Sequence, residues 1–107
     1  MRDIGPDDLP GVFGSSVLNL IRRGADGSLR MSADRWRFGG GDSERVVFRS
    51  IHDDPAESEQ MLEVPLAEVA RLTWDRLPRQ QARSQVRFHL TSGDLWTFSG
   101  MLNEPAS

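Results

Sequence analysis

The chain has 107 residues and contains no cysteine, lysine or tyrosine. Without cysteine it can form no disulfide, and no thiolate can ligate a metal or act as a nucleophile, as expected for a protein of a reducing compartment. No stretch approaches the ~20 consecutive apolar residues of a membrane span, and the N-terminus lacks the apolar run of a signal peptide. We therefore expect a cytoplasmic protein.

An excess of basic charge is also missing. Thirteen arginines stand against sixteen acidic residues, which gives a net charge of −3. Domains that bind nucleic-acid backbones usually carry a net basic surface, because they must neutralise phosphates. We therefore expect no nucleic-acid partner.

The length fits one domain and leaves no room for a second core. Residues 1–11 consist largely of glycine, proline and aspartate, which bury little surface, so we expect a flexible N-terminal arm there. Residues 12–100 form the predicted single β domain. Residues 101–107 are predicted to be a short C-terminal tail.

Within 12–100 the apolar residues alternate with a period of two in short segments separated by turn residues, which is typical of antiparallel strands. Leu18 and Leu20 belong to a first strand. The next segments predict a hairpin, with residues 28–31 and 35–38 as strands and a turn at Ser32–Asp34. Further strands are expected at 45–51, 61–64 and 71–75, exposed loops at 52–60 and 78–84, and a helical turn at 65–69 with proline at its first position.

The last hairpin allows a prediction of register. A two-residue loop would mix apolar and polar side chains on each face. A three-residue loop at 91–93 instead sets Phe88 opposite Trp96 and Val86 opposite Phe98, and it puts Gly93 at the left-handed position of the loop. We therefore predict the three-residue loop.

The same alternation predicts which side chains face the core. The residues expected to be buried are Leu29, Trp36, Phe38, Phe48, Leu72, Trp74, Phe88 and Trp96. The three tryptophans are expected to serve the core first, with a role in a binding groove second.

The order of these elements resembles a known family. The residues concerned are the run 27–38, the Val-Pro-Leu-Ala-Glu-Val step at 64–69, and the closing hairpin 86–98. Together they are similar to the GRAM and pleckstrin-homology-like domains, of a bacterial type. The resemblance implies a mainly β fold with little helix: a bent antiparallel sandwich or partly open barrel of about seven strands.

Most members of that family close one end with a C-terminal helix, and this chain departs from the pattern. Residues 99–107 are too short and too broken by asparagine and proline for a packed amphipathic helix. Three alternatives remain open: the N-terminal residues cover that end, a partner chain such as a second copy in a homodimer covers it, or the chain is cut short.

Five arginines are the candidate ligand-binding residues. Family members that hold inositol phosphates use a basic residue early in the opening hairpin and a basic pair beyond it, and Arg23 with Arg35 and Arg37 resembles that spacing. Asp26 and Asp34 lie close by and would repel a phosphate. The full set of candidates is Arg22, Arg23, Arg30, Arg35 and Arg37.

Residues for catalysis or metal binding are sparse. His52 with Asp53 and Asp54 is the one cluster of suitable types, and His89 is the only other histidine, but neither matches a recognised metal spacing. The serines lack the strand-turn-helix setting of a nucleophile elbow. We expect no enzyme, no metal and no cofactor.

Three function classes follow, in order of preference. The first is a non-enzymatic module that binds a protein or peptide partner through an open sheet edge or an apolar groove. The second is weak binding of anionic lipid or phosphoinositide headgroups through the five arginines between positions 22 and 37, which we call the arginine hairpin. Such binding would place the protein peripherally at a membrane. A small hydrolase is the distant third.

Overall fold

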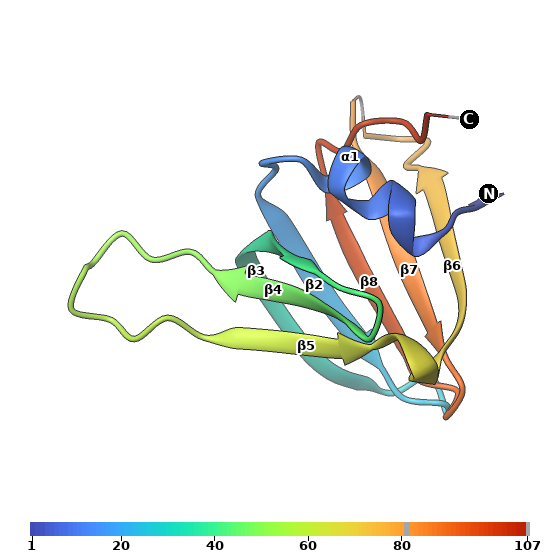
Figure 1. The fold of residues 1–107 in the computed structure, drawn as a ribbon, viewed down its shortest axis with the longest axis horizontal. Coiled ribbons are helices and arrows are strands. Elements are labelled where there is room, and N and C mark those ends of the chain that lie inside the picture. Colours follow the sequence, from blue (N-terminus) through green and yellow to red (C-terminus); the bar gives the residue numbers. More distant parts are fainter. Residues whose placement is uncertain (81, 107) are drawn as a thin grey trace.

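The computed structural model describes residues 1–80 and 82–106, in which eight antiparallel strands form a single sheet (Figure 1). Its strand order is β1-β6-β7-β8-β2-β3-β4-β5. In chain order the elements are β1 (Arg2–Asp3), η1 (Pro6–Asp8), α1 (Leu9–Phe13), β2 (Leu18–Arg23), β3 (Leu29–Gly41), β4 (Arg45–Ser50), β5 (Met61–Pro65), η2 (Leu66–Glu68), β6 (Val69–Arg76), β7 (Ser84–Leu90) and β8 (Leu95–Gly100). The predicted mainly β, antiparallel fold with little helix is confirmed.

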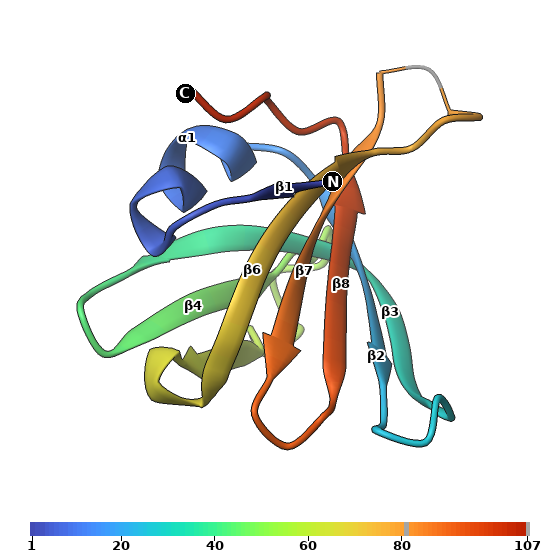
Figure 2. The same ribbon diagram turned by 90° about the vertical axis from the view of Figure 1, so that its right-hand side faces the viewer.

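The sheet is strongly bent, as Figure 2 shows. Phe48 of β4 stacks on Phe98 of β8 with ring centroids 3.9 Å apart, and it meets Phe88 of β7 edge-on at 6.0 Å. Since β4 is not a sheet neighbour of β7 or β8, the sheet must curl until its inner faces touch. The core is therefore enclosed by one sheet wrapped around aromatic side chains.

The N-terminal segment closes one end of this curled sheet, and the prediction of a flexible arm for residues 1–11 is wrong. Leu9 is completely buried, and β1 pairs with β6. The neighbouring Phe13 inserts into the core, with its ring 5.4 Å from Phe38 and Phe48 and 6.0 Å from Phe98. Apolar residues at 9, 12 and 13 lie on one face of a helical turn and override the turn-forming composition around them.

The C-terminal residues run beside α1 and hold it in place. The backbone N–H of Asn103 donates to the carbonyl of Val12, and its side-chain amide donates to the carbonyl of Gly11, both at 2.9 Å. Pro105 is buried. The predicted tail 101–107 is thus packed on the domain as far as residue 106, while Ser107 lies outside the described residues.

The predicted core is mostly confirmed. Trp36, Phe48, Leu72, Trp74, Phe88 and Trp96 are buried, and Phe38 is half-buried. Leu29 was predicted inward but is 57% exposed, so that prediction is wrong. It pairs with Arg23 at the turn end of the β2–β3 hairpin, where the register shifts and, among the described residues, no core side chains are left on the inner face for it to pack against.

The predicted turn at Ser32–Asp34 is also wrong, because β3 runs through it. The chain reverses instead at residues 24–28, where the N–H of Gly24 donates to the carbonyl of Ser28 and Gly27 adopts a positive φ of 83°. The turn-like residues of β3 mark a register shift against β2, and next to them Arg35 has a φ of 67°. A bulge and a turn use the same residue types, so local composition did not separate them.

The remaining loop and turn predictions agree with the structure. Val86 pairs with Phe98 and Phe88 with Trp96, as the three-residue loop requires, and Gly93 has a φ of 93°. The helical turn after Pro65 is η2, and residues 52–60 form a loop that projects from the body between β4 and β5 (Figure 1). The predicted loop 78–84 ends where β7 begins, and Gln81 within it lies outside the described residues.

Candidate functional site

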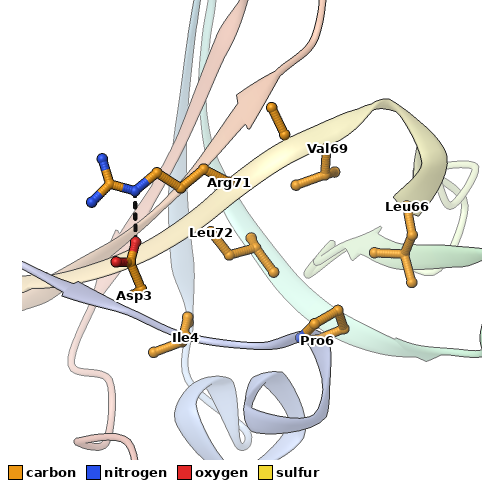
Figure 3. A pocket seen from close by; sticks show the side chains of 8 residues that line it. Asp3, Ile4, Pro6, Leu66, Val69, Arg71 and Leu72 are labelled. Atoms are coloured by element: carbon orange, nitrogen blue, oxygen red, sulfur yellow. Dashed lines mark hydrogen bonds and ion pairs between the residues drawn. The ribbon is translucent and has the colours of Figure 1, made fainter.

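An apolar groove lies at the edge of the sheet, beside the part of β6 that does not pair with β1. Figure 3 shows its walls: β6 on one side, the N-terminal segment on the other, and Leu66 of η2 closing one end. The groove encloses about 360 Å³. We call it the β6 groove, and its lining residues are Asp3, Ile4, Pro6, Leu66, Val69, Ala70, Arg71 and Leu72.

The groove exists because the N-terminal segment covers only part of β6. β1 pairs Arg2 with Trp74 and Asp3 with Thr73, and the N–H of Ile4 donates to the carbonyl of Leu72 at 3.1 Å. The chain then leaves β6 at Gly5 and enters η1, where Pro6 fits because a first helical residue needs no donor. Residues 69–71 of β6 therefore have no partner strand on this edge within residues 1–80 and 82–106.

A bulge adds to the irregularity of this edge. Val69 pairs with Leu90 and Arg71 with His89, so Ala70 is an extra residue on the β6 side. Bulges commonly occur at sheet edges and beside binding sites, where they redirect a side chain. Here Ala70 is exposed and lines the groove, so only a methyl group stands at the centre of the uncovered edge.

An ion pair marks the mouth of the groove. Arg71 Nε donates to Asp3 Oδ1 at 2.6 Å, as the dashed line in Figure 3 shows. The hydrogen bond from Arg71 lowers the pKa of Asp3, and the same bond raises the pKa of Arg71. Both side chains are largely exposed, so the pair fixes the position of the N-terminal segment more than it adds stability.

His89 lies behind the groove, opposite Arg71 across the β6–β7 pair. Its Nε2 is 3.1 Å from the hydroxyl of Thr73. Burial lowers the pKa of His89, and the nearby guanidinium groups of Arg71 and Arg87 lower it further. The imidazole is therefore held neutral at physiological pH.

The arginine candidates of the first hairpin face separate surroundings. Arg22 lies over the ring of Trp96, with its guanidinium carbon 4.0 Å from the ring centroid, and it lines a pocket near the β7–β8 turn. Arg23 donates to the carbonyl of Gly27 in its own hairpin. Arg30 is exposed and its guanidinium lies against Gly24.

Arg35 and Arg37 lie further along β3, near the loop 52–60. Arg35 forms an ion pair with Asp53 at 2.8 Å, and Arg37 pairs with Arg49 in the register of β3 and β4. The two arginines line two different pockets, which share Ser50 and His52. The five candidates thus belong to several sites rather than to one headgroup cradle.

His52 is not joined to its sequence neighbours Asp53 and Asp54 by ion pairing. It contacts Ser50 and Glu57 instead, at 2.7 Å and 2.6 Å. Among the residues that the structure describes, no three histidine or carboxylate side chains gather in a way that could hold a metal ion.

Sequence reasoning missed the β6 groove. Its residues come from the N-terminal segment, η2 and β6, which the fold brings together from 60 or more positions apart. One signal was available: the short apolar step at Leu66 and Val69 directly before a strand, beside an N-terminal segment with its own apolar residue at Ile4.

Comparisons with known proteins add no relatives: no family model matches the chain, and no curated protein or solved structure was found to match it. No helix within residues 1–80 and 82–106 is long and apolar enough to cross a membrane.

Proposed function

We propose that this domain is a binding module that accepts an extended peptide segment of a partner protein in the β6 groove. The peptide would pair with the uncovered backbone at residues 69–71 and place one apolar side chain between Ile4, Leu66 and Leu72. The observation that carries the proposal is the uncovered edge of β6 directly beside an apolar cavity.

The chain itself supplies a precedent for strand addition at this edge. Residues 2–4 already lie along β6 as an extended strand and bond to it through the backbone. Strand addition takes affinity from main-chain hydrogen bonds and specificity from pockets for alternate side chains. The β6 groove offers both the uncovered backbone at residues 69–71 and an apolar pocket next to it.

The other edge of the sheet is less suited to a peptide. β5 presents Glu63, which forms an ion pair with Arg45, and it ends at Pro65, which has no N–H to donate. Charged residues and proline are common means of protecting an edge strand from pairing. We therefore assign the partner to β6.

A weak affinity is expected because the uncovered edge is short. Burying one leucine-sized side chain contributes about 1.5–3 kcal/mol, and two or three backbone hydrogen bonds contribute about 1 kcal/mol each. The sum of about 3.5–6 kcal/mol corresponds to a dissociation constant of about 0.04–3 mM for a pentapeptide. A folded partner with further contacts would bind more tightly.

The proposal can be tested by calorimetric titration with acetyl-Arg-Val-Leu-Val-Arg-amide, whose side chains alternate as a strand requires and whose charge opposes the net charge of −3. The variant Ala70→Phe fills the groove and should abolish binding, whereas Ala106→Phe on the exposed tail should not. Absence of saturable binding to the wild type, or equal binding by Ala70→Phe, would contradict the proposal.

Membership of the GRAM and pleckstrin-homology-like family and a cytoplasmic location are parts of the same proposal. The resemblance of residues 27–100 supports the first, and the cysteine-free sequence supports the second. A binding role also accords with the way that family uses its scaffold.

A further inference from the structure

A second site, remote in the sequence from the β6 groove, is formed where β4 ends and the loop 52–60 begins. Ser50 Oγ lies 2.7 Å from His52 Nε2, and His52 Nδ1 lies 2.6 Å from Glu57 Oε2. The two imidazole nitrogens thus contact a hydroxyl on one side and a carboxylate on the other. This is the connectivity of a serine nucleophile, a general base and an orienting acid.

The backbone fixes these three side chains. Ser50 is the last residue of β4, and its N–H donates to the carbonyl of Gln60 at 2.9 Å. The loop is folded back by Asp54, whose carboxylate accepts the N–H of Ala56 at 2.9 Å and whose carbonyl accepts the N–H of Glu57 at 3.1 Å. That reversal brings Glu57 to His52, five residues away along the chain.

The hydrogen bonds favour one arrangement of the protons. Ser50 Oγ already accepts the N–H of Gln60 at 2.7 Å, so its own hydroxyl proton is free to point at His52 Nε2. When the imidazole is neutral, its single proton belongs on Nδ1, because the carboxylate of Glu57 can only accept. Nε2 is then the unprotonated nitrogen that a general base needs.

The three residues line open space. Ser50, His52 and Glu57 line two pockets, of about 400 and 370 Å³, large enough for a small acyl group. Trp36, directly opposite Ser50 in the β3–β4 register, lines the larger one, and its indole N–H has no hydrogen-bond partner in the described parts of the chain. Arg37 lines the other pocket and adds positive charge.

We propose that Ser50 is a nucleophile that reacts with small activated esters, with His52 as general base and Glu57 as the positioning residue. Ser50 Oγ forms a bond to the acyl carbon while its proton passes to His52 Nε2. The bond to the leaving alkoxide breaks, and the alkoxide takes that proton. Water, deprotonated by His52, then attacks the acyl-serine; the acid is released and the proton returns to Ser50 Oγ.

Covalent labelling with a small alkyl fluorophosphonate tests the proposal directly. Ser50 Oγ would bond to phosphorus, fluoride would leave, and the serine proton would pass to His52. Intact-mass spectrometry should show one adduct per chain, located on Ser50 by peptide mapping. Ser50→Ala should remove the adduct, while Ser58→Ala, which changes an exposed serine of the loop 52–60, should leave it unchanged.

The roles of the other two residues have their own readouts. His52→Ala should slow labelling at least tenfold, and added imidazole should restore part of the rate. Glu57→Gln should slow it at least tenfold and remove the downfield Nδ1–H proton resonance of His52, whereas Glu59→Gln, whose carboxylate pairs with Arg49, should do neither. Thermal melts of the variants check that the fold is kept.

The opposite results would overturn the proposal. Absence of any adduct, an adduct that persists in Ser50→Ala, or an unchanged rate in His52→Ala would each show that Ser50 is not an activated nucleophile. None of these results bears on peptide binding, since Ala70 and the β6 groove are untouched by Ser50→Ala and by the four substitutions in the loop 52–60.

Discussion

Replacing Phe13 with alanine should destabilise the whole domain. Phe13 is fully buried, and its ring packs 5.4 Å from Phe38, 5.4 Å from Phe48 and 6.0 Å from Phe98, so its removal leaves a cavity at the centre of the aromatic cluster. Phe→Ala at such a position typically costs about 3–5 kcal/mol. Because domains of this size are stable by about 5–15 kcal/mol, the loss is a large share of the total.

The measurement is urea denaturation followed by tryptophan fluorescence, with a thermal melt as a second readout. At about 4 °C per kcal/mol for a domain of ~100 residues, the melting temperature should fall by about 12–20 °C. Val17→Ala is the matched control, since Val17 follows the same helix but is 58% exposed, and it should cost under about 0.5 kcal/mol. A loss below about 1 kcal/mol in Phe13→Ala would refute the view that the N-terminal segment is part of the core.

Three further outcomes are expected. The folded-state pKa of His89 lies below the ordinary value of 6.5, so the unfolded chain binds the proton more readily than the folded one. The free energy of unfolding should therefore be highest above pH 6.5 and should decline as the pH falls below that value. His89→Gln should flatten this decline in urea titrations at pH 5 to 7.5. Arg30→Ala, Arg35→Ala and Arg37→Ala should each cause only a small, salt-sensitive loss of flotation with anionic vesicles. A saturable micromolar isotherm with an inositol phosphate, abolished by Arg35→Ala, would instead show a specific headgroup pocket. Leu29→Ser should leave the midpoint of urea unfolding almost unchanged, because the side chain is 57% exposed.

The β7–β8 hairpin shows what the sequence can specify by itself. Its two strands alternate strictly, so one register alone puts Val86, Phe88, Trp96 and Phe98 on the same face, and Gly93 suits the positive φ of the loop. Register and turn chemistry agree here. Local information was therefore sufficient.

The N-terminal segment shows where local information fails. Glycine, proline and aspartate around α1 favour turns, and five helical residues would not hold alone in water. The segment is ordered by what Leu9 and Phe13 contact, namely an opening left by a distant bend in the sheet. Such a contact depends on the assembled fold and leaves only a short apolar pattern in the sequence.

The two proposed sites were hidden for the same reason. Ile4 and Leu66 meet at the β6 groove only after β5 has led through η2 into β6. Ser50, His52 and Glu57 are close in sequence, but the pairing of His52 with Glu57 rather than with the adjacent aspartates depends on the turn at Asp54. The residue types were visible, but their partners were not.

The most direct test of the peptide-binding account is an NMR titration of the ¹⁵N-labelled domain with acetyl-Arg-Val-Leu-Val-Arg-amide. We expect saturable shifts of the backbone amides of Val69, Ala70 and Arg71, with slower hydrogen exchange at Ala70 because a new strand shields it; the amide of Val69 already donates to the carbonyl of Leu66. The Leu66 methyl groups should shift along the same isotherm. Shifts confined to β5 or to the arginine hairpin, or no shifts at millimolar peptide, would contradict the account.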